Sequence, residues 1–114
     1  MKVSLILATV ERYAEVERFL EKLDLQTYRN FELILVDQND GDPLRPLIEK
    51  YKNRFPLLHL RSERGLSRAR NVGMRRATGD LVAFPDDDCW YAPGVLEQAV
   101  GYFRREPAPD GVTG

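Results

Sequence analysis

Short apolar runs alternate with amphipathic segments along the whole chain. The apolar runs are rich in Val, Ile and Leu, which is typical of strands buried on both faces of a sheet. They span residues 3–9, 31–37, 57–60 and 81–84. Between these runs, and after the last one, hydrophobic residues recur at steps of three and four, which predicts helices. The predicted helices lie near residues 16–23, 44–51, 65–77 and 93–103.

This alternation of strand and helix predicts an α/β fold, in which an open, mostly parallel sheet carries helices on both faces. The chain has 114 residues, so we expect one domain over residues 1–114. We expect the strand order 3-2-1-4, with the reversal of strand order between the first and fourth strands. Ligands of such sheets bind beyond the carboxyl ends of the strands, at this reversal.

Acidic side chains follow two of the predicted strands. Asp86, Asp87 and Asp88 come after the fourth strand, and Asp37 ends the second. Adjacent carboxylates repel one another, so the three are either exposed to solvent or bind a cation. An acidic turn that caps the next helix is the alternative interpretation.

The chemistry of these acids favours a hard cation such as Mg²⁺ or Mn²⁺, because no histidine or second cysteine stands beside them. Such a metal binds through a few protein oxygens and substrate phosphates, and it can stabilise a departing diphosphate. The sequence contains neither a P-loop nor a G-x-G-x-x-G pattern, which argues against a P-loop kinase and a dinucleotide dehydrogenase. His59, inside the third strand, is interpreted as structural.

Composition and charge exclude further classes of protein. The net charge of −1 argues against a general nucleic-acid or membrane binder. Residues 61–76 nevertheless carry six arginines and one acid, which favours an anionic ligand there. The single cysteine excludes an internal disulfide. We expect a cytoplasmic location, with membrane association only through a larger parent protein or its partners.

Four segments, taken together in their order and spacing, resemble the nucleotide-binding half of family 2 glycosyltransferases of the GT-A fold. They are Val3–Thr9, Gln26-Thr27-Tyr28 before Phe31–Asp37, Gly65–Gly73, and Gly79-Asp80 leading to Asp86–Asp88. The resemblance implies a sugar nucleotide as donor and Mn²⁺ or Mg²⁺ as cofactor, in an inverting transfer to a glycan, lipid or protein acceptor.

The resemblance also implies roles for individual residues. Asp88 and Asp86 match the ends of the family's D-x-D pattern and would bind the metal, with Asp86 and Asp87 also facing the sugar nucleotide. The residues implied to line the nucleotide pocket are Thr9, Glu11, Asp37, Gln38 and Arg70. Gln38 stands where many members carry a second acid that contacts the base, which leaves the identity of the base open.

The family's general base is expected beyond Gly114, so we expect the 114-residue chain to bind the donor with weak or no transferase activity. The alternative is a non-catalytic nucleotide-binding module of the same fold. In either case, a surface left open by a missing half would favour association between copies of the chain. A nucleotidyltransferase is a third reading, and the lack of a glycine-rich, lysine-bearing loop after the first strand counts against it.

Overall fold

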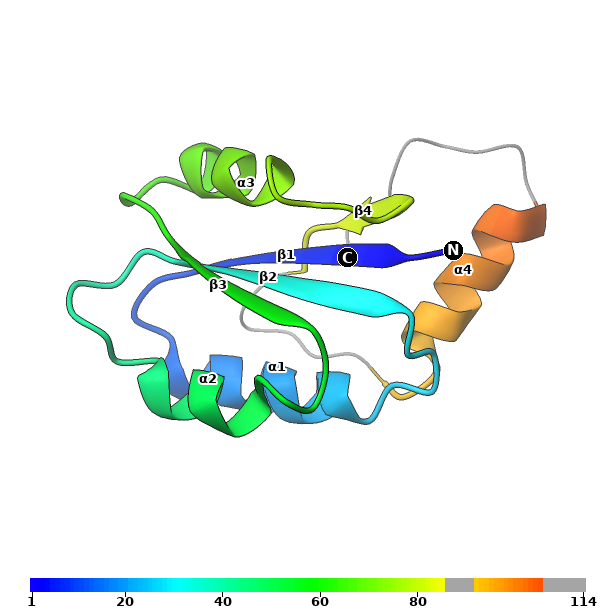
Figure 1. Ribbon diagram of the computed structural model, residues 1–114, viewed down its shortest axis with the longest axis horizontal. Coiled ribbons are helices and arrows are strands. Elements are labelled where there is room, and N and C mark those ends of the chain that lie inside the picture. The colour runs from blue at the N-terminus through cyan, green and yellow to red at the C-terminus, as the bar shows by residue number, and fades with distance from the viewer. Residues whose placement is uncertain (86–91, 106–114) are drawn as a thin grey trace.

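Four parallel strands form a single sheet in the order β3-β2-β1-β4 (Figure 1). The computed structural model describes residues 1–85 and 92–105. The strands are β1 (Val3–Thr9), β2 (Phe31–Asp37), β3 (Leu57–Arg61) and β4 (Leu81–Ala83). The predicted fold class and strand order are therefore confirmed.

The register of the sheet brings the carboxyl ends of the two central strands together. β1 and β2 pair along their whole length, from Val3 opposite Phe31 to Thr9 opposite Asp37. β4 pairs only with the first half of β1, where Val3 lies opposite Leu81. The far end of β1 is therefore free of β4, and the chain after Thr9 borders an open space at this edge of the sheet.

Helices cover both faces of the sheet, as expected. They are α1 (Tyr13–Asp24), α2 (Arg45–Tyr51), α3 (Leu66–Met74) and α4 (Val95–Arg105). Figure 1 shows α1 and α2 on one face and α3 on the other. None of the helices within the described residues is both long enough and apolar enough to span a membrane.

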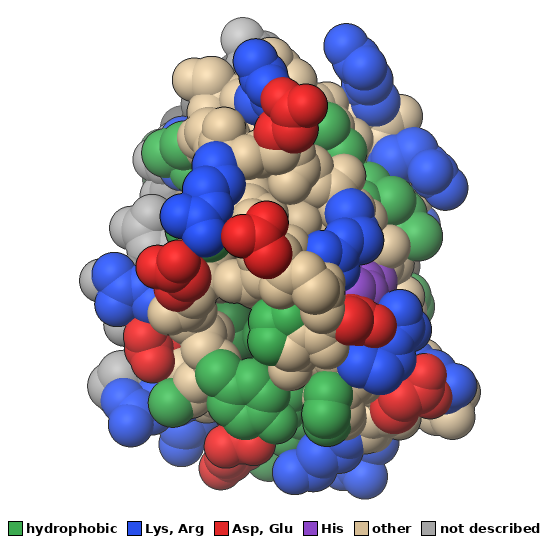
Figure 2. All heavy atoms as spheres, turned by 90° about the vertical axis from the view of Figure 1, so that its left-hand side faces the viewer, with side chains coloured by type: hydrophobic (Ala, Val, Ile, Leu, Met, Phe, Trp, Pro, Cys, Tyr) green, Lys and Arg blue, Asp and Glu red, His purple; other side chains and the backbone are tan. Residues whose placement is uncertain are grey.

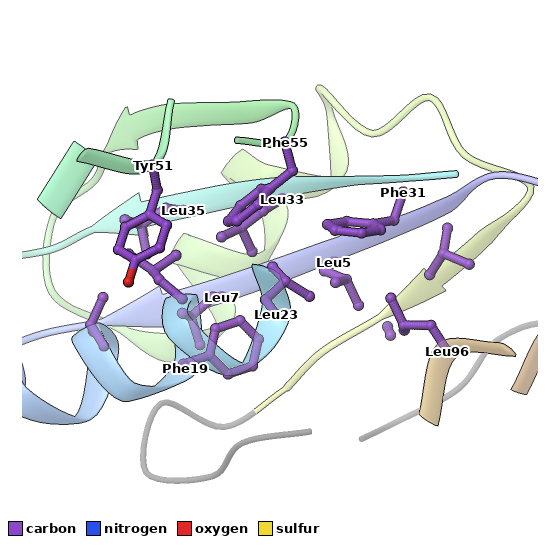
Figure 3. Close-up of a cluster of buried hydrophobic side chains, with 14 of the residues drawn as sticks. Leu5, Leu7, Phe19, Leu23, Phe31, Leu33, Leu35, Tyr51, Phe55 and Leu96 are labelled. Carbon is purple, nitrogen blue, oxygen red and sulfur yellow. The ribbon is translucent and has the colours of Figure 1, made fainter. Parts of the chain in front are cut away.

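The larger hydrophobic core lies on one face of the sheet, between the strands and the helices α1, α2 and α4. Because side chains alternate along a strand, Leu5 and Leu7 point into this core together with Leu33 and Leu35. Figure 3 shows these leucines among the buried side chains, Phe19 included, that gather on this face of the sheet. Aromatic side chains close the core towards β3, with the rings of Phe31 and Phe55 5.5 Å apart.

The smaller core lies between the sheet and α3, and Gly73 determines how closely that helix approaches. A Cβ atom at Gly73 would lie 2.4 Å from Cγ2 of Ile6 and 3.3 Å from Cγ2 of Val36. A glycine inside a helix costs about 1 kcal/mol relative to alanine. Close packing against β1 and β2 explains its presence here.

Two helices begin slightly later than the sequence pattern predicts. α3 begins at Leu66 and is capped by Gly65. α4 begins at Val95, two residues after Pro93. Its first turn is held by the buried side chain of Gln26, which accepts a hydrogen bond from the Leu96 amide and donates one to the Ala92 carbonyl.

Candidate functional site

A hollow of about 610 Å³ lies at the carboxyl ends of β1 and β2, on the face of the sheet that α3 covers. This volume is within the range of small-molecule binding sites. Its walls come from β1, the segment after β1, the residue after β2, the start of α3, and Pro85. The lining residues are Ile6, Ala8, Val10, Glu11, Arg12, Gln38, Arg64, Gly65, Leu66, Arg70 and Pro85.

Charge around the hollow is mixed, with positive groups in the majority. Arg12, Arg64 and Arg70 line it, whereas Glu11 is the only acid among the lining residues that the structure describes. Figure 2 shows this side of the molecule, where basic and acidic side chains are interspersed. Three arginines at one hollow favour an anionic ligand with several oxygens, since guanidinium groups bind such oxygens through paired hydrogen bonds.

Three of the predicted nucleotide-binding residues, Glu11, Gln38 and Arg70, line this hollow. The Arg70 guanidinium carbon lies 5.0 Å from the centre of the Phe84 ring, so α3 and the end of β4 together orient this side chain. Such a cation–π contact is worth about 0.5–1 kcal/mol at an exposed site.

Glu11 has an unusual backbone conformation. Its φ angle is +56°, in the left-handed region that residues with a side chain seldom adopt. The Glu11 amide donates a hydrogen bond to the side-chain oxygen of Asn39, and the Glu11 carboxylate accepts one from Arg64 at 2.9 Å. These two contacts hold the segment after β1 against the segment after β2 and against the approach to α3.

Asp37 is fully buried and lies outside the lining of the hollow. One of its carboxylate oxygens accepts hydrogen bonds from the backbone and side-chain nitrogens of Asn39, at 2.9 and 2.8 Å. The other oxygen contacts His59 at 3.0 Å and Arg61 at 3.4 Å. Asp37 therefore has an organising role, and it shapes the hollow through Asn39.

Thr9 is also buried and is not among the lining residues. Its carbonyl oxygen accepts a hydrogen bond from the Gln38 amide at 2.9 Å, which continues the pairing of β1 and β2 beyond the strands. Thr9 thus fixes where Gln38 leaves the sheet.

A group of three potential metal ligands comprises Asp37, Asp42 and His59, with ligand atoms within 4.8 Å of one another. A cation already belongs to this group, because Nη1 of Arg61 lies 3.4 Å from the Asp37 carboxylate and 3.7 Å from that of Asp42. The donor set is therefore that of an ion-pair cluster, and His59 bonds to Asp37 as a structural residue would. The predicted metal ligands Asp86 and Asp88, and Asp87 between them, lie outside the described residues.

The alternation of side chains separates residues that face the hollow from those that do not. Ile6, Ala8 and Val10 share one face of β1 and its extension, whereas Thr9 points to the other. The same parity places Gln38 on the side of α3 and Asp37 on the side of His59. This alternation is also present in the sequence, and it separates Thr9 and Asp37 from the residues that line the hollow.

Arg12 and Arg64 were missed as lining residues. Arg64 belongs to the arginine-rich stretch of residues 61–76, so composition indicated the segment without indicating the residue.

Comparison with known proteins agrees with this arrangement. A family model described as glycosyl transferase family 2 matches residues 4–113. The chain belongs to glycosyl transferase family 2. The resemblance inferred from the sequence motifs is therefore confirmed for nearly the whole chain.

Among curated relatives of this family 2 chain, an uncharacterized glycosyltransferase from Haemophilus influenzae is 36% identical over 107 residues, which cover 92% of the chain and 35% of the relative. The putative glycosyltransferase EpsH of Bacillus subtilis is 35% identical over 99 residues, which cover 84% of the chain and 28% of the relative. The chain thus spans about a third of the length of the curated relatives it matches.

Solved structures of glycosyltransferases share the GT-A fold of this family 2 chain. TarS of S. aureus, residues 1–349, in complex with UDP-GlcNAc superimposes with a TM-score of 0.78 at 29% identity, covering 92% of this chain and 32% of TarS. The mannosyltransferase PcManGT of Pyrobaculum calidifontis, in complex with GDP-Man and Mn²⁺, gives a TM-score of 0.82 at 26% identity, with coverage of 92% and 32%.

Proposed function

We propose that this chain binds the nucleotide-sugar donor of a family 2 glycosyltransferase in the hollow at the ends of β1 and β2, for inverting, metal-dependent transfer of the sugar to an acceptor. The observation that carries the proposal is the hollow itself, a space of about 610 Å³ lined by three arginines in a chain of this family. The complexes of TarS with UDP-GlcNAc and of PcManGT with GDP-Man support a donor of this class.

The lining offers distinct surroundings for the parts of such a donor. Arg12, Arg64 and Arg70 supply guanidinium groups for the negatively charged diphosphate. Apolar side chains of β1 and the start of α3, among them Ile6 and Leu66, offer a surface for a flat base. The arrangement therefore suits a ligand with one charged end and one ring.

The proposed metal is Mn²⁺ or Mg²⁺, held by Asp88 and Asp86 at the acidic segment that follows Pro85 in the sequence. When bound, such an ion stabilises the charge that develops on a departing nucleoside diphosphate. Pro85 lines the hollow, so the acidic segment begins next to it along the chain. The complex of PcManGT with Mn²⁺ supports this choice of metal.

We also propose that the 114-residue chain binds the donor without transferring the sugar. A general base, most often an imidazole or a carboxylate, must lie within reach of the acceptor hydroxyl. Among the described lining residues the single carboxylate is Glu11, and it is ion-paired with Arg64. Asp37 and His59 lie outside the lining and are bonded to each other.

Calorimetric titration of UDP and of GDP, each with and without Mn²⁺, tests donor binding and its metal dependence together. We expect one of the two nucleotides to bind in the presence of Mn²⁺ and to lose at least about ten-fold in affinity in Asp88→Ala. Glu17→Ala, which removes an exposed carboxylate from α1, is the matched control and should bind as the wild type does.

Failure of both nucleotides to bind the folded wild-type chain would refute the proposed function. Nucleotide binding whose affinity changes neither with Mn²⁺ nor with Asp88→Ala would refute only the metal dependence of the proposed function. Transfer or hydrolysis of a donor sugar by the isolated chain would contradict the view that it lacks a general base.

A further inference from the structure

A second space, a groove of about 540 Å³, lies along the exposed side of α3. The opposite side of this helix packs against β1 and β2. The groove begins at Arg64, Gly65 and Leu66, which also line the hollow at the ends of β1 and β2. The rest of its lining comes from α3 and the residue after it, and we call this space the α3 groove.

Arg68, Asn71 and Arg75 form one stripe along the α3 groove. Steps of three and four residues bring side chains to the same side of a helix, and all three side chains are exposed. At a rise of about 1.5 Å per residue, Arg68 and Arg75 lie about 10 Å apart along the helix axis. The stripe therefore places two guanidinium groups well apart, with a neutral amide between them.

The charge of the α3 groove has one sign. Three arginines line it, and no acid is among the lining residues that the structure describes. Arg64 pairs with Glu11 and Arg68 with Glu63, but these carboxylates are 71% and 80% exposed. Exposed ion pairs contribute little to stability, so an anion can replace either carboxylate at low cost. Arg75 has no ion-pair partner within the described part of the chain.

The first turn of α3 adds neutral donors at the same end of the groove. Its first helical bond runs from the Ala69 amide to the Gly65 carbonyl, and no side chain caps the helix. The amides that precede Ala69 have no partner inside the helix, and such amides favour phosphate groups. The hydroxyl of Ser67 lies in this turn and lines the groove. Guanidinium, amide and hydroxyl donors together suit phosphates, since each phosphate offers several acceptor oxygens.

We propose that the α3 groove binds a linear phosphate polymer, whose successive phosphates contact Arg64, Arg68 and Arg75. A single phosphate is too small to contact both ends of a stripe about 10 Å long, whereas a chain of phosphates contacts the arginines in turn. The groove lies outside the donor hollow except at their shared rim, so this binding does not depend on the proposed function.

The lining distinguishes this partner from two other anionic ones. No aromatic side chain is among the lining residues in the described part of the chain, so the groove offers no surface on which the bases of a single-stranded nucleic acid would stack. A lipid bilayer is flat, and its headgroups would contact the rim of a groove more than its lining. A polymer of phosphates without bases fits the groove best.

Titration of long-chain inorganic polyphosphate into the wild type, Arg68→Gln and Arg75→Gln tests the proposal. Each substitution removes one guanidinium group, and we expect each to lower the affinity about five-fold at low salt. Arg76→Gln removes the same charge next to Arg75 but outside the lining, so this control should stay within about two-fold of the wild type. UDP and GDP should bind Arg75→Gln as they bind the wild type, because Arg75 does not line the hollow.

The salt dependence counts the contacts. The slope of log affinity against log salt should be about −2 in the wild type, the value for three phosphates held in a single strand. Arg75→Gln should make the slope shallower by about 0.7, and Arg76→Gln should leave it unchanged. A wild-type slope near zero would contradict ionic contacts in the groove.

Three results would overturn the proposal. Equal losses in Arg75→Gln and Arg76→Gln would show attraction to charge in general. A loss in Arg70→Ala without one in Arg75→Gln would place the polymer in the hollow. Tighter binding of oligothymidylate or of phosphatidylglycerol vesicles, at equal phosphate concentration, would assign the groove to nucleic acid or to a membrane.

The proposed function and this proposal fail separately. A wild type that binds UDP or GDP but no polyphosphate would overturn only the role of the α3 groove. A wild type that binds polyphosphate but neither nucleotide would refute only the donor site. Should Arg68→Gln not fold by circular dichroism, Arg75→Gln decides the matter, because Arg75 is exposed and lies after the end of α3.

Discussion

The backbone amide of Glu11 donates a hydrogen bond to the side-chain oxygen of Asn39, across the gap between the ends of β1 and β2. Asn39 in turn donates two hydrogen bonds to the buried carboxylate of Asp37. A single amide side chain therefore joins an internal ion-pair cluster to the wall of the hollow.

Asn39→Ala should destabilise the fold and also weaken nucleotide binding. The substitution removes the side-chain bonds to Asp37 and to Glu11, and we expect a loss of about 1–2 kcal/mol in the free energy of unfolding. Urea denaturation measures the stability, and titration with the nucleotide that binds measures the affinity. Asn53→Ala, at an exposed position after α2, should change neither. A stable Asn39→Ala with wild-type affinity would show that the Glu11 segment needs no such support.

Gly73→Ala should destabilise the protein because α3 cannot approach the sheet with a methyl group at this position. The added Cβ would lie 2.4 Å from Cγ2 of Ile6, a stiff side chain that is 1% exposed. Overpacking of this kind costs about 1–3 kcal/mol, which outweighs the better helix propensity of alanine. Urea denaturation of Gly73→Ala beside Gly101→Ala gives the comparison, since a Cβ at Gly101 would meet no atom of the described residues within 4 Å.

Phe84→Leu should weaken nucleotide binding about two- to five-fold, with little change in the ligand preference of the site. The Phe84 ring orients the Arg70 guanidinium, and leucine keeps the apolar contact but lacks the aromatic face. Arg70→Ala should lower the affinity further, whereas Arg76→Ala, beyond the end of α3, should not. Calorimetry on the three variants tests the order, and equal affinities for Phe84→Leu and wild type would show that the stacking does not orient Arg70.

The pH dependence of stability should report on Glu32 of β2. Its carboxylate accepts hydrogen bonds from Ser4 of β1 and from Thr78, which follows α3. Burial acts to raise the pKa of Glu32, but hydrogen bonds from Ser4 and Thr78 and the charge of Lys2 outweigh it, so the pKa is lowered. A lowered pKa gives stability that is present above the ordinary glutamate value of about 4.3 and is lost as the pH falls through the folded-state pKa.

Glu32→Gln should therefore lower the free energy of unfolding at pH 7 by about 1 kcal/mol, and the difference from wild type should shrink below about pH 4. Urea denaturation curves recorded across this range measure both effects. Glu17→Gln, on the exposed face of α1, provides the reference curve. Parallel stability profiles for wild type and Glu32→Gln would contradict the assignment.

The strands were predictable because buried parallel strands have continuous apolar runs, and polar segments separate these runs clearly in this chain. The starts of α3 and α4 were less predictable because they depend on contacts between distant parts of the chain. Gln26, which holds the first turn of α4, is 70 residues away from its partner Leu96. No local pattern contains that information.

The residues of the site were predictable in part. The others were not, because their positions also depend on contacts between distant parts of the chain. The motif positions gave Glu11, Gln38 and Arg70, which line the hollow. Asp37 was placed with them because the motif does not state which way a side chain points, although strand alternation does. The pairing of Arg61 with Asp37 and Asp42 is a long-range contact, so only the structure shows that this apparent metal group already contains a cation.

The two faces of the sheet are anchored very unequally. Within the described part of the chain, the buried hydrophobic residues beneath α3 are Ile6, Ile34, Val36 and Ala69, whereas the cluster on the opposite face is much larger. The layer formed by α3, which contributes Arg70 and follows Gly65, is thus packed less extensively than the opposite layer. We expect α3 to open locally while the strands stay folded. A ligand that contacts both α3 and the central strands would stabilise the packed state of α3. The backbone amides of α3 should therefore exchange hydrogen more slowly once the ligand is bound.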